Sequence, residues 1–470
     1  MAKKFYVTTP IYYPNDIPHV GHAYTTIVAD VLSRWNKIRG KDVLFTTGVD
    51  DHGMKVLETA KENNLPPKEF VDKIVPRFKD AWEKLNIDYS RFIRTTDKDH
   101  KKIVQNILQK IYDKGEIYLG EYEGYYCVGC EAYLTEKELE NGCCPIHKKK
   151  VKKLKEETYF FKIQNYKDRL LKLYEKGFIL PKNKTSEMVH RVKELDRDLS
   201  ISRTSFDWGI PVPFDKKHVT YVWFDALLNY YTSTQEKNRQ DFWPCDLHIV
   251  AKDIFYFHAV MWPAILMAAD LPVPKNLFVH GYWTFGKEKI SKSRGKVINV
   301  DELIALTGNV DSVRYFLLRA TPFGKDGDFS EKALVERHNN ELADKLGNLV
   351  SRVSGLIEKE GCKQNRKWKT PFLTVNVKKD VGELMENFEF DKVLNRIFAY
   401  VDSLNKWVQD EKPWEIHEED FKRAVLYNLK EGILLIAELL WPFIPESSEK
   451  ITKQFSSKNI KKGEILFKKV

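Results

Sequence analysis

The chain has 470 residues, 43% of them hydrophobic and 13% aromatic, so it can hold about two to four globular domains with buried cores. Its 77 Lys and Arg against 67 Asp and Glu give a formal charge of +10, which suits a polyanionic partner, although solubility alone also explains a basic surface. No run of roughly 18 apolar residues and no signal-peptide pattern occurs, which excludes a helical membrane span and predicts a cytoplasmic protein.

The first 40 residues predict a strand, a proline-rich loop and a helix. Residues 5–8 form a β-branched and aromatic run that is typical of a buried strand. Ile27, Val31 and Trp35 then recur at helical spacing, and Gly40 stands where a helix would end. In such a unit the loop lies at the carboxyl edge of a parallel sheet, where the helix N-terminus favours phosphate.

The loop between this strand and helix carries a pair of histidines instead of a dinucleotide fingerprint. It lacks G-x-G-x-x-G, which disfavours a nicotinamide or flavin cofactor. His19 and His22 stand one helical turn apart, with Gly21 between them where a side chain would block a ligand. Imidazoles there can donate hydrogen bonds to phosphate oxygens during displacement at phosphorus. Two surface histidines capping a helix would give the same pattern.

A second strand, predicted over 42–46, leads into a polar loop at the same sheet edge. Two carboxylates and a histidine, residues 50–52, can hold an ammonium group or a metal there, or can form a turn with helix-capping acids. The charged, amphipathic stretch over 66–114 predicts helix and closes the first half of an α/β domain.

An insert then interrupts the sheet, and it carries four of the six cysteines. Cys127 and Cys130 form a Cys-x2-Cys knuckle. Cys144 and His147 follow with Cys-x2-His spacing, so three thiolates and one imidazole can complete a tetrahedral zinc shell. Cys143 can replace Cys144 by a small shift of the turn. A shell closed by protein ligands predicts one structural zinc ion, and thiols near a turn are the alternative.

Beyond the insert, the chain returns to the sheet near 221–227. Residues 247–251 predict a buried strand that ends in the polar pair 252–253, and an apolar helix follows over 254–267. Residues 278–281 predict the last strand of the sheet. Strand, polar pair and helix repeat the opening pattern, which indicates the second half of a split nucleotide-binding fold.

The remaining sequence predicts a mobile basic loop and then a helix bundle. Residues 286–296 alternate cations and small hydroxyls between glycines, and their ammonium groups can surround a triphosphate. From residue 333 the pattern is helical, with no strand-like run before 465–467. Leu342, Leu346 and Leu349 share one helical face, as expected in a bundle.

Two of these motifs resemble the signatures of class I aminoacyl-tRNA synthetases. Residues 19–22, His-Val-Gly-His, resemble the HIGH signature, and residues 289–293, Lys-Ile-Ser-Lys-Ser, closely match KMSKS. Several more blocks resemble those of the methionyl-tRNA synthetase family, namely residues 9–13, 221–226, 252–254, 256–258 and 346–352. The resemblance covers nearly residues 4–450.

The resemblance implies a ligase that activates methionine with ATP to methionyl-adenylate and pyrophosphate, then transfers methionine to the 3′-terminal adenosine of its tRNA. The catalytic residues that it implies are His19, His22, Lys289 and Lys292. The implied ATP-binding residues are His19, Gly21, His22, Asp253, Lys289 and Lys292, with Mg²⁺ accompanying the ATP. The implied methionine-binding residues are Ile11, Tyr13, Asp50, Trp223, Ala226, Tyr230, Ile254, Phe257 and His258. Asn348, Arg352 and Trp414 occupy the positions where this family contacts the methionine anticodon.

The expected fold is a split Rossmann-like α/β catalytic domain with a parallel sheet and an inserted zinc-knuckle domain, followed by an all-α bundle. The predicted divisions are 1–115 and 221–282 for the catalytic halves, 116–220 for the insert, 283–335 for the domain of the KMSKS loop and 336–470 for the anticodon-binding bundle.

Three departures from the family pattern bear on partners. There is one knuckle where some relatives have two, Leu227 replaces a proline, and the C-terminal oligonucleotide-binding barrel of longer members is absent. A monomer is therefore expected, with room for a separate tRNA-binding subunit. An adenylate-forming enzyme that never meets RNA is one alternative, which the helical domain disfavours. A catalytically inactive RNA-binding relative is another, which the presence of both histidines and both signature lysines disfavours.

Overall fold

A parallel β-sheet forms the core of the first of two compact units. The structure is a computed structural model, and it describes residues 3–129, 132–134, 136, 139–145, 148–285, 288–289, 298–365 and 376–470. Unit 1 comprises Met1–Pro18, Asn36–Asp80 and Asp88–His280. Unit 2 comprises His19–Trp35, Ala81–Ile87 and Gly281–Val470.

The sheet of unit 1 has the strand order β3-β2-β1-β12-β13-β7, and all its neighbouring strands are parallel. Its strands are β1 Lys4–Tyr12, β2 Asp42–Val49, β3 Arg91–Arg94, β7 Ile179–Leu180, β12 Leu247–Ala251 and β13 Asn276–His280. Their residues are mostly buried, as expected when helices cover both faces of a parallel sheet. The strands predicted over 5–8, 42–46, 247–251 and 278–281 are confirmed.

The helices of unit 1 correct one prediction. They are α2 Met54–Glu62, α3 Pro67–Lys84 (whose last turn belongs to unit 2), α4 Lys98–Asp113, α5 Lys167–Glu175, α6 Thr185–Lys193, α7 Val222–Leu227, α8 Asn229–Thr232 and α9 Trp262–Ala268. The helical region predicted over 66–114 contains α3 and α4, but the strand β3 lies between them and pairs with β2, which the prediction lacked. Gly48 of β2 allows this pairing, since a Cβ there would lie 2.0 Å from the Ile93 carbonyl oxygen.

The second half of the sheet also differs from expectation in three places. Residues 221–227 form helix α7, and the chain re-enters the sheet only at β12. The helix expected over 254–267 begins as a 3-10 turn, Lys252–Ile254, and a π-helical turn, Phe257–Met261, before α9. β13 is not the last strand, because the short β7 from within the insert pairs with its outer edge.

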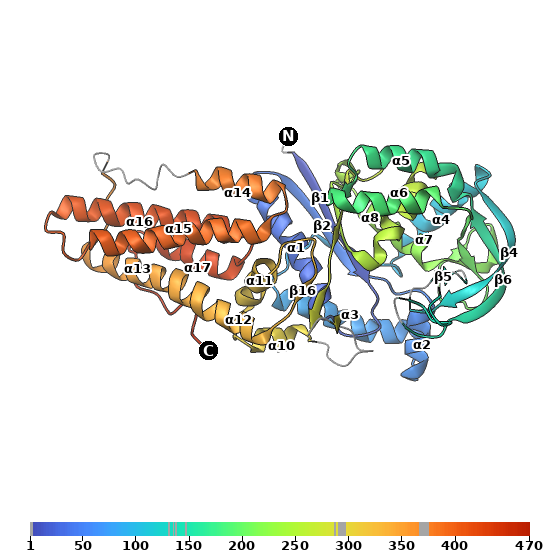
Figure 1. Cartoon of the computed structure of the whole chain (residues 1–470), viewed down its shortest axis with the longest axis horizontal. Helices are drawn as coiled ribbons and strands as arrows, with labels where there is room; N and C mark the ends of the chain where they lie inside the picture. The colour runs from blue at the N-terminus through green and yellow to red at the C-terminus, as the bar shows by residue number, and fades with distance from the viewer. Residues whose placement is uncertain are drawn as a thin grey trace. The chain divides into compact units, whose positions relative to one another are not determined.

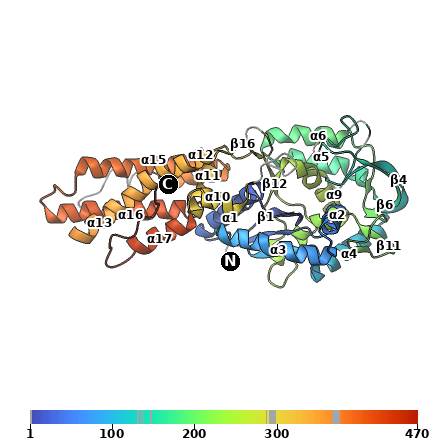
Figure 2. The same ribbon diagram turned by 90° about the horizontal axis from the view of Figure 1, so that it is seen from below.

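Antiparallel strands build the rest of the insert. One sheet has the order β5-β4-β6-β8, from β4 Ile117–Cys127, β5 Ala132–Leu134, β6 Lys152–Phe161 and β8 Leu199–Ser200. A smaller sheet has the order β10-β11-β9, from β9 Ser202–Arg203, β10 Pro211–Val212 and β11 Asp215–Thr220. Helices α5 and α6 run side by side in Figures 1 and 2.

Unit 2 includes most of α1, Val20–Ile38, whose last three residues belong to unit 1. The regular structure in the rest of its described residues is helical apart from a small sheet of β14 Trp283–Phe285, β15 Glu288–Lys289 and β16 Gly327–Asp328. Its further helices are α10 Val300–Ala305, α11 Val310–Arg319, α12 Glu331–Arg337, the π-helical His338–Gly347, α13 Asn348–Glu360, α14 Val377–Glu386, α15 Phe390–Glu411, α16 Glu419–Leu440 and α17 Pro445–Phe455. Helices α15 and α16 run alongside each other in both views (Figures 1 and 2).

The predicted bundle is confirmed, because the leucines at 342, 346 and 349 are fully buried. The strand-like run over 465–467 forms no strand. Phe467 is instead buried beside the ring of His338, whose Nε2 lies 2.7 Å from the Lys468 carbonyl oxygen. Within this run, Phe467 is therefore the residue that packs on the bundle, whereas Ile465 is exposed.

A buried ion network joins three separate segments of unit 2. The guanidinium of Arg314 donates to Asp30 Oδ2 of α1 at 2.6 Å, to Leu85 O at 3.0 Å and to Pro442 O at 2.8 Å. Arg34 donates to the same Asp30 oxygen at 2.8 Å. Multiple hydrogen bonds of this kind are what a buried charge requires.

Within the described part of the chain, no helix is both long and apolar enough to cross a membrane.

Candidate active site

The carboxyl edge of the parallel sheet gathers three of the predicted site residues in unit 1. Tyr13 follows β1, Asp50 follows β2 and Asp253 follows β12, and these three strands are neighbours. Asp50 is buried; its N–H donates to Tyr12 O at 2.8 Å, and its Oδ1 accepts from Thr95 Oγ1 at 3.3 Å. Asp253 is exposed. A buried carboxylate and an exposed one at the same sheet edge can hold an ammonium group and a hydroxyl-bearing group, respectively.

The loop that carries Asp50 is clamped from two sides. Arg94, at the end of β3, donates from Nε to Asp51 Oδ2 at 2.7 Å, and the Thr96 hydroxyl donates to the same oxygen. Trp208 of the insert donates from its indole N–H to Asp51 O at 2.6 Å. Burial raises the pKa of Asp51, against the attraction of Arg94. The loop is thus held by side chains that lie outside the predicted site.

The residues predicted to contact methionine belong largely to one apolar cluster. Trp223 and Tyr230 are buried in it, and Tyr13, Ile254 and Phe257 pack against it. The rings of Trp223 and Phe257 stack with centroids 3.9 Å apart and an interplanar angle of 3°. Two further predicted residues, Ile11 on β1 and Ala226 on α7, are partly buried and buried, respectively. Stacked rings of this kind offer a flat, polarisable surface to an apolar side chain.

His258 is neutral, and its hydrogen bonds fix its tautomer. Its Nδ1 lies 2.9 Å from Ile254 O and therefore donates, so Nε2 accepts the hydroxyl of Tyr230 at 2.7 Å. Burial lowers the pKa of His258 to about 4, and burial raises the pKa of Tyr230. This part of the cluster therefore carries no charge at neutral pH.

The signature histidines stand at the N-terminus of α1 in unit 2. Their rings stack with centroids 3.9 Å apart. The Nδ1 of His19 accepts from the N–H of Gly21 at 3.0 Å, and the Nδ1 of His22 accepts from the N–H of His19 at 3.2 Å. In the neutral form each ring must therefore carry its proton on Nε2, which is the donor that a phosphate oxygen needs.

Within unit 2, the first signature motif contacts the segment at residues 298–299. His19 pairs with Asn299 in a β-bridge, and the N–H of Val20 donates to Ile298 O at 3.1 Å. Residues 298–299 come after the second signature, 289–293, in the sequence. Lys289 lies in β15, whereas Lys292 lies outside the described residues. At Gly21, a Cβ would lie 2.9 Å from the His19 ring, so glycine is needed for this ring packing as well as for ligand approach.

The zinc knuckle is only partly within the described residues. Cys127 ends β4 and is buried, and Cys144 is buried in a turn where Lys148 N–H donates to Cys144 O at 2.8 Å. Cys143 is partly exposed. Cys130 and His147 lie outside the described residues, and among the described side chains no group of three or more His, Cys, Asp or Glu residues is arranged so that it could hold a metal ion.

The predicted anticodon contacts lie in the bundle. Asn348 begins α13 and is exposed, and Arg352 lies one turn further along. The amide of Asn348 donates to Asp344 O at 2.9 Å. Trp414 lies in the turn between α15 and α16, and 48% of its surface is exposed. Such exposure is unusual for an indole.

Sequence reasoning missed the residues that fix the loop after β2. Arg94 and Trp208 hold its backbone and carboxylates, and Asp225 with His100 holds His52, as described below. The usable signal for Arg94 was the short apolar pair Phe92-Ile93, which is followed by Thr95-Thr96 and indicates a strand inside a charged region.

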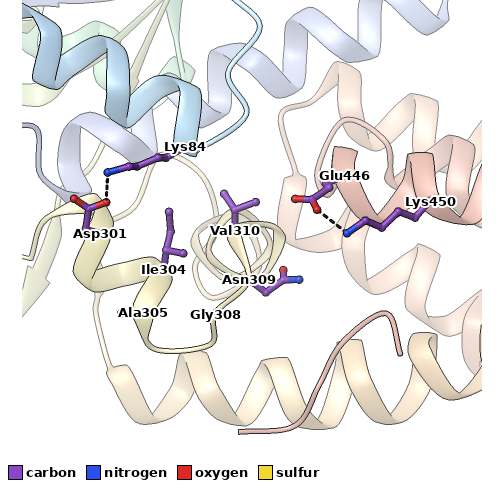
Figure 3. A pocket seen from close by; sticks show the side chains of 9 residues that line it. All are labelled: Lys84, Asp301, Ile304, Ala305, Gly308, Asn309, Val310, Glu446 and Lys450. Carbon is purple, nitrogen blue, oxygen red and sulfur yellow. Dashed lines mark hydrogen bonds and ion pairs between the residues drawn. The ribbon is translucent and has the colours of Figure 1, made fainter. Parts of the chain in front are cut away.

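A separate cavity of about 590 Å³ in unit 2 contains none of the predicted site residues (Figure 3). It is lined by Lys84, Asp301, Ile304, Ala305, Gly308, Asn309, Val310, Glu446 and Lys450. Its cations face carboxylates, with Lys84 2.7 Å from Asp301 and Lys450 2.6 Å from Glu446. Because these charges neutralise each other, the cavity is a poor candidate for binding phosphate.

Known proteins resemble this chain over almost its whole length. The family of tRNA synthetases class I (M) matches residues 5–153 and 136–354, and the anticodon-binding domain of tRNA ligase matches residues 373–469. A methionine–tRNA ligase of Caldanaerobacter subterraneus subsp. tengcongensis is 43% identical over all of this chain and 79% of its own length. That of Fusobacterium nucleatum is 45% identical over 97% of this chain and 74% of its own length.

A solved structure is similar over almost the whole chain. It is a Mycobacterium tuberculosis methionyl-tRNA synthetase bound by methionyl-adenylate, with a TM-score of 0.92, 37% identity and coverage of 99% of this chain and 96% of that one. Because the family model covers most of the chain and relatives of over 40% identity match nearly all of it, the chain belongs to the methionyl class I tRNA synthetases.

Proposed function

We propose that this chain carries out both steps of methionine ligation to tRNA with the residues described above. The activity follows from its family: it activates methionine with ATP and transfers it to tRNA. The pairing of His19 with Asn299 best supports the proposed assignment of residues, since it joins the first signature, at the N-terminus of α1, to a residue that comes soon after the second signature in the sequence.

In the first step, the carboxylate of methionine attacks the α-phosphorus of ATP and pyrophosphate leaves. The N–H groups at the start of α1 and the Nε2–H donors of His19 and His22 would stabilise the charge that develops on phosphate oxygens. Lys289 and Lys292 would neutralise the leaving pyrophosphate, and Mg²⁺ enters with the ATP as part of that substrate. No side chain acts as a nucleophile, so catalysis consists of positioning and charge stabilisation.

In the second step, a hydroxyl of the 3′-terminal adenosine attacks the carbonyl carbon of methionyl-adenylate and AMP leaves. Asp50 would hold the methionine ammonium group throughout, and Asp253 the ribose of the nucleotide. Both residues follow strands at the carboxyl edge of the sheet, the usual ligand edge of such folds.

Selection of methionine would rest on shape and soft contacts. The stacked pair Trp223 and Phe257 offers polarisable surface, and the neutral His258 with Tyr230 offers no charge to favour a polar side chain. Apolar pockets distinguish one methylene by only about 1 to 3 kcal/mol. Norleucine and homocysteine should therefore be activated detectably.

A structural zinc ion would be held by Cys127, Cys130, Cys144 and His147. The burial of Cys127 and Cys144, and the tight turn at Cys144, suit thiolate ligands, whereas the partly exposed Cys143 suits the role less well. When bound, zinc would hold the knuckle together and supply no water to the reaction. The division of the chain at residues 115, 220, 282 and 335, and a monomeric state, stay predictions.

The helical bundle would read the anticodon through Asn348, Arg352 and Trp414. Two of these carry hydrogen-bonding groups on one face of α13, and the third exposes an indole on which a base can stack.

Exchange of labelled pyrophosphate into ATP with a panel of amino acids tests the first step. Methionine should support the fastest exchange, and addition of tRNA should yield methionyl-tRNA. Faster exchange with leucine or cysteine would overturn the pocket proposed here.

A further inference from the structure

A buried carboxylate bridges two histidines within unit 1. Asp225 of α7 accepts from His52 Nδ1 on Oδ2 at 2.7 Å and from His100 Nε2 on Oδ1 at 2.8 Å. The exposed fractions of Asp225, His100 and His52 are 0%, 0% and 2%. The three side chains come from three elements: α7, α4 and the loop after β2.

Asp225 is ionised in this setting. Burial opposes its ionisation, but the attraction of His52 and the hydrogen bonds from both imidazoles outweigh burial and hold the pKa of Asp225 below its usual range. A buried carboxylate of this kind keeps its position only while both partners stay in place, because a lost partner leaves a charge uncompensated.

His100 is itself fixed from behind. Its Nδ1 lies 3.0 Å from the hydroxyl of Thr232, and that hydroxyl lies 3.0 Å from Leu228 O in the helical segment after α7. Both ring nitrogens are therefore engaged, which prevents the imidazole from rotating. The chain of hydrogen bonds leads from Thr232 through His100 and Asp225 to His52.

Two members of this bridge, His52 and Asp225, adjoin residues of two different kinds in the proposed methionine site. His52 follows Asp50, the proposed ammonium ligand, by two positions in the same clamped loop. Asp225 lies on α7 between Trp223 and Ala226, which belong to the proposed apolar contacts. Loop and helix are adjacent because the bridge joins them.

We propose that Asp225 and His100 are positioning residues for methionine, setting Asp50 at its working distance from the apolar contacts on α7. Neither residue touches methionine; each acts through the placement of others. The inference rests on the proposed methionine site, and it predicts an effect on methionine affinity that a contribution to core stability alone would not produce.

His100 allows a matched pair of variants. In His100→Gln the amide nitrogen takes the place of Nε2 and can still donate to Asp225, whereas His100→Leu removes the donor and leaves Asp225 with one partner. In pyrophosphate exchange we expect His100→Leu to raise the KM for methionine by about tenfold or more, with the kcat and the KM for ATP within about threefold of the wild type. His100→Gln should stay within about threefold in all three constants.

Asp311→Asn is the control, because Asp311 is a buried carboxyl in unit 2, outside the proposed site. It should leave the KM for methionine unchanged whatever it does to the Tm. If His100→Leu does not fold, Thr232→Val, which removes only the hydroxyl behind His100, replaces it and should also raise the KM for methionine.

Different results would overturn the proposed function and the positioning role. Wild-type protein without methionine-dependent exchange would overturn the proposed function. An active wild type, together with a His100→Leu or Thr232→Val variant that has a lowered Tm but a normal KM for methionine, would overturn the positioning role. Equal rises in the KM for methionine and for ATP would overturn it as well.

Discussion

The side chains of His19 and His22 show how backbone contacts decide what a residue can offer a ligand. Their identity and spacing were predictable from sequence. Their tautomers were not, since these depend on N–H groups that point at Nδ1 only once α1 has formed. With Nδ1 occupied, Nε2 is the atom that can donate to phosphate.

Two substitutions of His22 distinguish the roles of its two ring nitrogens. His22→Gln places an amide nitrogen near the position of Nε2, whereas His22→Asn places one near Nδ1. If Nε2 is the donor, His22→Asn should slow adenylate formation by about 100- to 1,000-fold, with methionine binding little changed, and His22→Gln should retain more activity. Single-turnover rates and equilibrium binding measure the two effects. Equal loss in both variants would argue against donation from Nε2.

The buried His258 predicts a pH dependence of stability. Its pKa in the folded protein is about 4, below the value of about 6.5 expected in the unfolded chain. As pH falls from 6.5 to 4, the unfolded state therefore binds a proton that the folded state does not, and stability decreases by about 3 kcal/mol.

Urea unfolding at several pH values checks this. His258→Asn, which keeps a donor to Ile254 O, should show a shallower fall over the same range than the wild type. His248 is also buried, and burial lowers its pKa, so it too makes the protein less stable as the pH falls. The difference in stability between the wild type and His258→Asn therefore isolates the contribution of His258. Identical pH profiles would contradict the assignment.

Among the secondary-structure elements, β3 shows where sequence reasoning stopped. Its four residues include two arginines and lie between two charged helices, so helical periodicity concealed the strand. Only the pairing with β2 reveals that Ile93 is buried and that Arg94 reaches Asp51. The loops after β1, β2 and β12 were predictable because polar residues directly follow apolar strands. Asp225 and His100 were not, because more than 100 residues separate them.

The proposed zinc knuckle of Cys127, Cys130, Cys144 and His147 predicts the zinc content of the protein. One zinc ion per chain is expected, and Cys127→Ser should abolish stoichiometric zinc and loosen the insert, which lowers activity indirectly. Cys143→Ser should retain zinc, because Cys144 is the buried cysteine of the pair. Elemental analysis of the purified variants measures the content. If Cys143→Ser lost zinc and Cys144→Ser kept it, Cys143 would be the zinc ligand in place of Cys144.

Substitution of Trp414, in the turn between α15 and α16, should impair tRNA recognition alone. Trp414→Ala removes an exposed indole and should lose about 1 to 3 kcal/mol of tRNA recognition through lost stacking, while methionine activation remains normal. Arg352→Ala should behave likewise and relax selection at one anticodon base. Aminoacylation kinetics with cognate tRNA and with anticodon variants tests both. Normal charging, or a parallel loss of pyrophosphate exchange, would contradict the role of the bundle.

Across the whole molecule, the chain passes between its two units several times. Unit 2 needs Ala81–Ile87 and His19–Trp35 in addition to everything after His280. Arg314 depends on both segments, since Asp30 and Leu85 supply two of its acceptors. The helical half is therefore not a separable module of the linear sequence.

A fragment of residues 281–470 should accordingly be much less stable than the same helices in the full chain. Without Asp30, the guanidinium of Arg314 loses its buried counter-charge, a loss that costs about 3 to 5 kcal/mol in comparable sites. Circular dichroism during urea unfolding compares the two proteins. In the fragment, Arg314→Met should restore part of the lost stability. A fragment with the midpoint of the full chain would show that these contacts are dispensable.

The two-residue strand β7 gives the insert a role that its cysteines do not suggest. It pairs with β13 through Leu277 and Phe278, and so covers the hydrogen-bonding groups on the outer side of an apolar strand. An uncovered edge of that kind recruits strands from other chains. Shortening the insert for engineering would thus expose a template for self-association, and the resulting protein would precipitate before any change in its chemistry could be measured.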